Sequence, residues 1–206
     1  IFHIQKDFFA KIRFNVMYII FVISLTAYVF LHSALAATPV KRYFHKRISK
    51  QHYRIWYNII SLFLMVPILI IYYKYAPTNL SDNILLKIVG TSLLLLGLDL
   101  FRQCRPIYDW NEFLGISFSE QQELSTAGLL EYVRHPLYLA SLILMSGLIL
   151  LNLNMWSLSA YLIIIVYLLL GIHFEEKKLV MQFGTPYRLY QHQVPMLIPK
   201  TLKLFK

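Results

Sequence analysis

Two short segments, about forty residues apart, place ionisable side chains at the outer ends of two long apolar runs. The first reads Arg134-His135-Pro136-Leu137-Tyr138, and the second begins at Glu175-Glu176. Together they offer a cation, a ring nitrogen, a phenol and two carboxylates, without a Ser/His/Asp or Cys/His set for covalent catalysis. Charged groups at membrane depth cost several kcal/mol unless they are paired or used. We therefore expect Arg134 to pair with one of the two glutamates.

A helical hairpin must bring these two segments together. An apolar run over 136–151 and a second over 155–174 are joined by the short turn Asn152-Leu153-Asn154. Since the outer ends of such a hairpin lie side by side, the side chains of both segments should converge at one membrane face. The first arm, at about 1.5 Å per residue, is only about 24 Å long, shorter than the roughly 30 Å hydrocarbon core. Its start, where Pro136 favours a first helical turn, should lie at or below the interface.

The composition is that of a membrane protein. Of 206 residues, 58% are apolar or aromatic and 15% are charged, with a mean hydropathy of +0.55, outside the range of soluble globular domains. Three further apolar runs, 14–36, 55–76 and 84–100, bring the expected total to about five transmembrane helices. These apolar runs lack the alternation of apolar and polar residues that is typical of the strands of a membrane β-barrel. The fold class is therefore all-α integral membrane, one domain over 1–206, with an N-terminal part over 1–123, a functional part over 124–199 and an amphipathic C-terminal tail.

The charges predict the orientation. Fifteen of the 20 Lys and Arg residues lie in 37–54, in 101–136 or after 174, which favours a cytoplasmic position for these segments, although Lys6, Lys11 and Arg13 argue the other way. The net charge of +10 is spread between apolar spans, so membrane lipids with anionic headgroups are expected partners and nucleic acid is not. The protein is expected in a cell inner membrane or an endomembrane. Cys104, the single cysteine, and the His positions provide no zinc site.

The N-terminus allows a second interpretation. Ala34-Leu35-Ala36 resembles a signal-peptide cleavage site, but the apolar run before it is longer than a secretory h-region, so it is expected to remain as a span. The chain opens with Ile, and further residues are expected before it.

The C-terminal part resembles the isoprenylcysteine carboxyl methyltransferase family, which is related to the phospholipid methyltransferases. The matching positions are Arg134-His135-Pro136-Leu137-Tyr138, Glu175-Glu176, Leu179, Phe183-Gly184, Tyr187, Tyr190, Val194-Pro195 and Ile198-Pro199. They cover roughly 124–199 in the order and spacing of that family. In the N-terminal part, His32-Ser33, Tyr108-Asp109 and Phe113-Leu114-Gly115 resemble bacterial-type relatives, including thiol methyltransferases and NnrU-like proteins.

The resemblance implies an enzyme that transfers a methyl group from S-adenosylmethionine within the membrane, leaving S-adenosylhomocysteine. It implies Arg134 and Glu176 as catalytic residues, and His135, Tyr138, Glu175, Glu176, Tyr187 and Tyr190 as cofactor-binding residues. These side chains offer a cation for the carboxylate of the cofactor and acceptors for its amino group and hydroxyls. The acceptor should be a small or lipophilic molecule with a carboxyl, thiol or amine group. No obligate protein partner is implied.

Other interpretations stay open on the sequence alone. Arg134 and Glu176 could form a purely structural buried ion pair. The tyrosines at the membrane interface could be belt residues, namely Tyr138, Tyr187 and Tyr190. His173 and Glu176 share a helical face but lack the further ligands of a metal site in a helix bundle. Among functions, the alternatives are a non-catalytic NnrU-like membrane protein and a sterol-reductase-like enzyme that uses NADPH.

Overall fold

The structure, a computed structural model, describes residues 2–77, 83–114, 116 and 123–200, and all regular elements in this part of the chain are helices. The first half holds α1 (Phe2–Ala36), α2 (Thr38–Phe44), α3 (Lys50–Tyr75), α4 (Ile84–Cys104) and the short α5 (Trp110–Leu114). The second half holds a 3₁₀ turn, η1 (Gly128–Glu131), followed by α6 (Pro136–Leu151), α7 (Met155–Phe183) and α8 (Thr185–Gln193). The expected all-α class is thereby confirmed.

Helices α1, α3, α4 and α7 are each long and apolar enough to cross a membrane, and α6 is a shorter apolar helix of 16 residues. The protein is an integral membrane protein. Two helices are longer than the apolar runs that predict them. Helix α1 begins at Phe2 rather than at residue 14, and α7 ends at Phe183 rather than at residue 174. Hydropathy marks only the part of a helix in lipid, while the backbone hydrogen bonds continue past it.

Local signals in the sequence set the helix ends. The side chain of Asn154 accepts the backbone N–H of Ser157 at 3.0 Å at the start of α7, and Ser49 caps α3 in the same way through His52. Helix α6 begins at Pro136, which needs no hydrogen-bond partner for a backbone N–H there. Gly184 ends α7 with a φ of 62°, a left-handed conformation that glycine adopts at little cost. The break between α7 and α8 falls at this residue.

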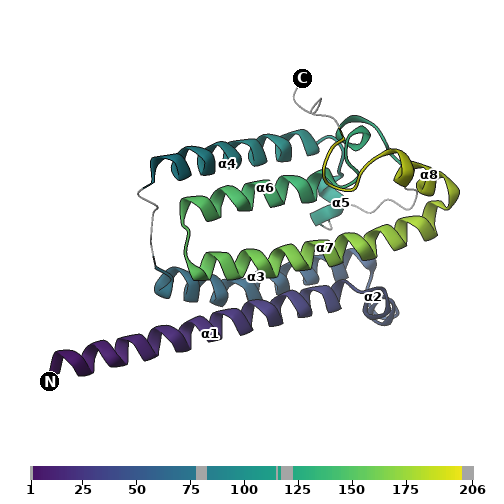
Figure 1. The fold of residues 1–206 in the computed structure, drawn as a ribbon. Coiled ribbons are helices and arrows are strands. Elements are labelled where there is room, and N and C mark those ends of the chain that lie inside the picture. The colour runs from purple at the N-terminus through teal and green to yellow at the C-terminus, as the bar shows by residue number, and fades with distance from the viewer. Residues whose placement is uncertain (1, 78–82, 115, 117–122, 201–206) are drawn as a thin grey trace.

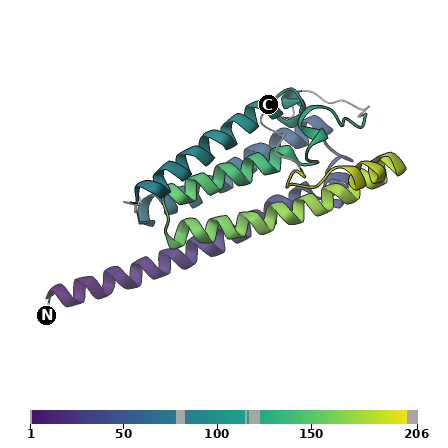
Figure 2. The same ribbon diagram turned by 45° about the horizontal axis from the view of Figure 1, so that its top comes forward.

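Glycines bring α4 and α6 into close contact. A Cβ on Gly97 would lie 2.7 Å from the backbone of Leu144, and a Cβ on Gly147 would lie 2.6 Å from the backbone nitrogen of Leu94. Small residues permit this approach between membrane helices, where dispersion contacts replace the hydrophobic effect. The two glycines are therefore packing residues, and the two helices run side by side in Figures 1 and 2.

An aromatic core joins α1, α3 and α7. Phe21, Leu25, Ile68 and Trp156 are buried together there, with Trp156 in contact with the rings of Phe21 and Tyr18. Hydroxyl pairs support the same contacts, since Tyr72 bonds Ser157 at 2.7 Å. The outward faces of these helices are apolar and exposed, as expected for surfaces in contact with lipid.

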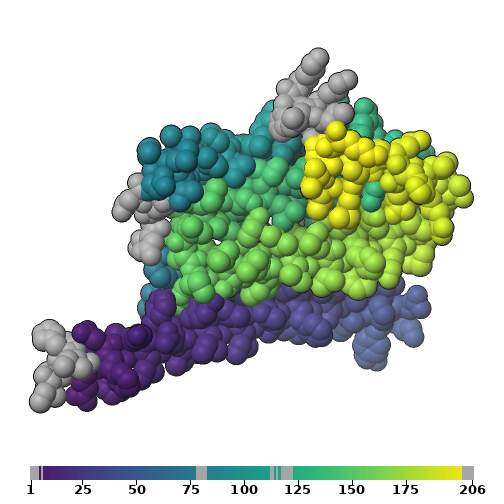
Figure 3. Space-filling view, viewed as in Figure 1, coloured from purple at the N-terminus to yellow at the C-terminus, as the bar shows by residue number. Residues whose placement is uncertain are grey.

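All three short helices lie at one end of the bundle. Figure 1 shows α2, α5 and α8 together at the right, with the N-terminus of α1 at the far left, and the first turns of α1 extend beyond the other helices in Figures 2 and 3. The segment after α8 lies against this same right-hand end in Figure 3. We call this end, where α6 begins and α7 ends, the polar end.

Candidate active site

The tail of the chain is hydrogen-bonded to the start of α6. The backbone N–H of Arg134 donates to the carbonyl of Pro195 at 2.9 Å, and that of His135 donates to Met196 at 3.2 Å. On the other side, α8 is joined to η1, because the Tyr190 hydroxyl donates to the Leu130 carbonyl at 2.6 Å. The two predicted segments and the tail therefore form one structure at the polar end.

Arg134 lies at its centre and forms a bidentate ion pair with Glu176. Its Nε donates to Glu176 Oε1 at 2.6 Å and its Nη2 donates to Oε2 at 3.1 Å. The other terminal nitrogen, Nη1, donates to the carbonyls of Gln191 and Val194 at 2.9 and 2.5 Å. Four of the five N–H groups of the guanidinium are thus engaged, and 10% of the side chain is exposed.

Glu176 accepts three further hydrogen bonds. His135 Nε2 lies 3.0 Å from Oε1, the Tyr187 hydroxyl donates to Oε1 at 3.3 Å, and Gln191 Nε2 donates to Oε2 at 2.7 Å. A carboxylate offers about four lone-pair positions, so these bonds and the two from Arg134 leave no acceptor capacity. The carboxylate of Glu176 therefore joins α6, α7 and α8.

Glu175 has a different environment, although it is the neighbouring residue. Its Oε2 accepts the Tyr138 hydroxyl at 2.7 Å, and no basic side chain in the described part of the chain pairs with it. A half-buried carboxylate without a cation is unfavourable, so this position favours a positively charged ligand group. Gly171, one turn earlier on α7, adds no side chain in front of the Tyr138 ring.

The tyrosines of this end keep their protons. Burial raises the pKa of the Tyr187 phenol, the charge of Glu176 raises it further, and Arg134 opposes the change. Burial likewise raises the pKa of Tyr190 to about 12. In the loop before η1, burial raises the pKa of Tyr108, and the Cys104 thiol and the Glu175 carboxylate add to the effect. The tyrosine hydroxyls near Glu175 and Glu176 are thus kept protonated by burial and by the negative charge of the two carboxylates.

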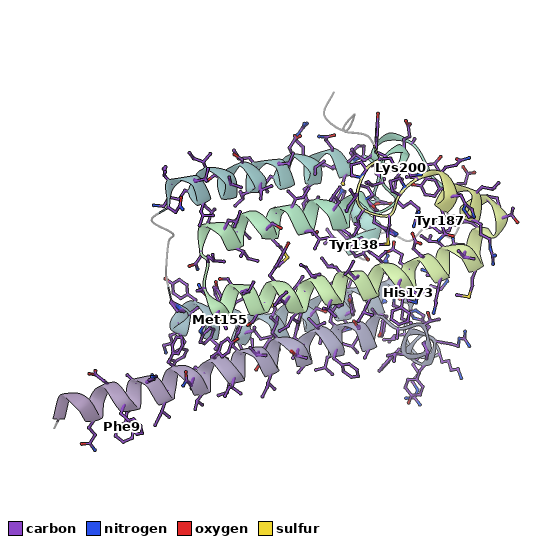
Figure 4. All side chains as sticks on the ribbon, in the orientation of Figure 1. Phe9, Tyr138, Met155, His173, Tyr187 and Lys200 are labelled. Carbon is purple, nitrogen blue, oxygen red and sulfur yellow. The ribbon has the colours of Figure 1, made fainter. Side chains whose placement is uncertain are left out.

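The structure brings all seven predicted site residues to the polar end: Arg134, His135, Tyr138, Glu175, Glu176, Tyr187 and Tyr190. Figure 4 places Tyr138 and Tyr187 at this end, with Met155 at the opposite end of α7. The expected pairing of Arg134 is confirmed, with Glu176 as the partner. The predicted catalytic and binding roles of these residues stay predictions.

Sequence reasoning missed Gln191, and it named Tyr108 only as a position that resembles bacterial-type relatives, not as a neighbour of Glu175. Gln191 follows Tyr187 by four positions on α8, so helical periodicity alone places both on one face. Tyr108 gave no spacing signal that links it to Glu175. The His173 ring contacts Phe174, is exposed, and takes no part in the hydrogen bonds described above. On α4, Asp99 and Arg102 form an ion pair at 2.8 Å.

Comparison with known proteins assigns the class. The family described as phospholipid methyltransferase matches residues 85–186, which run from α4 to the start of α8. A methanethiol S-methyltransferase from Crocosphaera subtropica is 27% identical over 187 residues, covering 82% of this chain and 69% of the relative. A methanethiol S-methyltransferase from Pseudomonas deceptionensis is 26% identical over 191 residues, covering 86% and 71%. No solved structure matches the chain.

The fold, the polar end and these relatives define an integral membrane methyltransferase. The phospholipid methyltransferase match and these relatives support a membrane methyltransferase family for this chain. The protein is therefore an enzyme that transfers methyl groups, and the family expected from the Arg-His-Pro and Glu-Glu segments is confirmed.

Proposed function

We propose that this protein transfers the methyl group of S-adenosylmethionine to the sulfur of a small thiol, with methanethiol as the first candidate. Two curated relatives named above are methanethiol S-methyltransferases, and a small apolar thiol partitions readily into the lipid that surrounds this bundle. The observation that carries the proposal is the contrast between Glu176, which is neutralised by Arg134, and Glu175, which has no cationic partner among the described residues.

The residues of the polar end fit the methyl donor. When bound, S-adenosylmethionine supplies a methyl group on a positively charged sulfur, together with an amino group, a carboxylate and a nucleoside. The carboxylate of Glu175 would hold one of its two cationic groups, and Tyr138, which donates to Glu175, fixes the carboxylate in place. The half-buried position of Glu175 keeps this interaction strong, because electrostatic attraction is screened less away from water.

Arg134 and Glu176 act in this proposal as positioning residues. Their hydrogen bonds are used within the protein, so they hold α8 and the tail against the start of α6 and leave one guanidinium N–H for a ligand. The imidazole of His135, only 3% exposed, is held by the same carboxylate. Methyl transfer needs an in-line approach of about 3 to 3.5 Å between reacting atoms, and a rigid frame of this kind favours it.

We further propose that the polar end faces the cytoplasm, where S-adenosylmethionine is made. The three segments that hold most of the Lys and Arg residues meet at this end of the bundle, as the positions of α2, α5 and α8 in Figure 1 indicate. This distribution is the one that the positive-inside rule associates with the cytoplasmic side.

The test is a turnover assay with the purified protein in lipid nanodiscs. Methanethiol and S-adenosylmethionine should give dimethyl sulfide in the headspace, measured by gas chromatography, and S-adenosylhomocysteine in equal amount. Phosphatidylethanolamine in the same nanodiscs serves as the amine acceptor. If methylated lipid forms and dimethyl sulfide does not, the acceptor is a lipid amine and not a thiol. If calorimetry shows that NADPH binds and S-adenosylhomocysteine does not, the proposal that S-adenosylmethionine is the methyl donor is refuted.

A further inference from the structure

A second group of polar side chains lies inside the bundle, separate from the hydrogen bonds of Arg134 and Glu176. We call it the His32 cluster: His32 on α1, Tyr57 and Ser61 on α3, and Tyr167 on α7. His32 Nε2 lies 2.6 Å from the Tyr57 hydroxyl, and His32 Nδ1 lies 3.0 Å from the hydroxyl of Ser61. The Tyr167 ring meets the imidazole edge to face, with the centroids 6.0 Å apart.

The His32 cluster differs from the other polar contacts between these helices. Tyr18 bonds Ser159, Tyr72 bonds Ser157, and Tyr161 bonds Ser146, and none of these hydroxyl pairs includes an ionisable imidazole. Such pairs suffice to join membrane helices. His32 instead places a group that can take up a proton within a membrane-spanning helix, with hydroxyl groups at both ring nitrogens. Ionisable groups at this depth are expensive and usually serve function.

One face of α7 connects the His32 cluster to Glu175. Tyr167, Gly171 and Glu175 follow one another at four-residue spacing, which places them on the same face of the helix. At 1.5 Å per residue, Tyr167 lies about 12 Å from Glu175 along the axis, deeper in the membrane. Tyr138 spans part of that distance, because its hydroxyl bonds Glu175 and lies 3.8 Å from the Cβ position of Gly171.

From this arrangement we infer that the His32 cluster is the acceptor site, and that His32 removes the proton of the thiol. The inference rests on the proposed thiol methylation. A small thiol has one polar bond, S–H, and otherwise needs apolar surroundings, which a small polar cluster among membrane helices provides. Both ring nitrogens are hydrogen-bonded to hydroxyls, of Tyr57 and of Ser61. Each hydroxyl can donate or accept, so the thiol proton passes to a hydroxyl while that hydroxyl gives its own proton to the imidazole.

The transfer balances without a further reactant. An electron pair of the thiol sulfur forms the new S–CH₃ bond. The bond between that methyl group and the donor sulfur breaks, and its electron pair stays on the donor, which becomes neutral. The thiol proton moves to the imidazole of His32 and leaves from there to water after release of the thioether.

The test compares His32→Gln with Tyr72→Phe, which breaks a hydroxyl pair with Ser157 outside the cluster and serves as the matched control. Two acceptors of similar size are used, ethanethiol and the more acidic trifluoroethanethiol. General base catalysis contributes roughly 10²- to 10⁴-fold, so His32→Gln should lower kcat/KM for ethanethiol by at least about 100-fold. The loss for trifluoroethanethiol should be smaller, because an acidic thiol depends less on a base. Calorimetric affinity for S-adenosylhomocysteine should stay unchanged in both variants.

Three results would overturn the inference. If His32→Gln turns over as fast as the wild-type protein, the His32 cluster serves only helix packing. If kcat/KM falls equally for the two thiols, His32 does not accept the thiol proton. A parallel loss of S-adenosylhomocysteine affinity would assign the cluster to the donor site. If His32→Gln does not fold, Tyr57→Phe keeps the imidazole, removes the hydroxyl that links its Nε2 to the thiol, and should show the same difference between the two thiols. A wild-type protein that methylates no thiol would refute the proposed function itself, and the acceptor site with it.

Discussion

Replacing the two neighbouring glutamates by glutamine, one at a time, should change two different properties. Glu176→Gln should lower the stability of the fold, and Glu175→Gln should lower the affinity for the methyl donor. Glu176 accepts five hydrogen bonds from four residues, and two of these bonds form the ion pair with Arg134. A glutamine at this position accepts at one oxygen only and turns an amide donor toward other donors. Breaking a buried ion pair costs about 3 to 5 kcal/mol, which lowers the melting temperature by on the order of 10 °C for a chain of this size.

Glu175→Gln should leave stability nearly unchanged. The amide oxygen can still accept the Tyr138 hydroxyl, which is the bond that Glu175 makes in the described structure. The variant instead loses the charge that would hold a cationic group of the donor. Hydrogen bonds to charged groups contribute about 1.5 to 3 kcal/mol, so ligand affinity should fall roughly 10- to 150-fold.

Both effects can be measured on one preparation. Cys104 is the single cysteine and is fully buried, so a maleimide dye that fluoresces on reaction with a thiol reports unfolding during a temperature ramp. Calorimetry with S-adenosylhomocysteine and with sinefungin, which carries an additional amine in place of the sulfonium, measures affinity. A larger loss for sinefungin would place Glu175 near the transferred methyl group, and equal losses would place it near the amino group of the donor.

Two results would refute this reasoning. Equal melting temperatures for the two variants would mean that the hydrogen bonds of Glu176 contribute no more than those of Glu175. Unchanged affinity of Glu175→Gln for both ligands would mean that Glu175 does not contact the donor.

Three further predictions concern packing, titration and orientation. Gly147→Ala should destabilise the protein by about 1 to 3 kcal/mol, because its Cβ would meet the backbone of α4, whereas Gly171→Ala, with 3.8 Å of space, should not; thermal unfolding followed at Cys104 decides, and equal effects would contradict the packing argument. Tyr190→Phe leaves a buried carbonyl without a partner and should cost about 1 to 3 kcal/mol. Since the folded state raises the pKa of Tyr190 from 10.0 to about 12, the difference in unfolding free energy should be constant below pH 10 and disappear as the pH rises through about 12. Green fluorescent protein fused after the last residue should fluoresce in a bacterial inner membrane, and alkaline phosphatase activity of the matching fusion would reverse the orientation.

The hairpin and its site were predictable because both follow from one-dimensional patterns. Two apolar runs joined by a three-residue turn can only return side by side, so Arg134 and the glutamates had to meet. Pro136 and Gly184 are local signals, and both act where the sequence placed them.

The difference between Glu175 and Glu176 was not predictable. Consecutive residues on a helix point about 100° apart, and which of them meets Arg134 depends on the rotation of α7 against α6. The backbone bonds from Arg134 and His135 to the tail involve carbonyl groups, which carry no sequence signal. The partners of His32 likewise depend on the register of α1 against α3, which apolar spans of nearly uniform hydropathy do not encode.

The attachment of the tail to the start of α6 has a consequence for biosynthesis. Arg134 and His135 are translated and inserted long before Pro195 and Met196, to whose carbonyls their backbone N–H groups donate. Until then the guanidinium of Arg134 also lacks the carbonyls of Gln191 and Val194. A nascent chain can therefore have all its apolar helices in the bilayer and still hold an unfinished site. Ribosome stalling or proteolysis within 191–196 would leave an inserted protein in which Arg134 and His135 lack these hydrogen-bond partners.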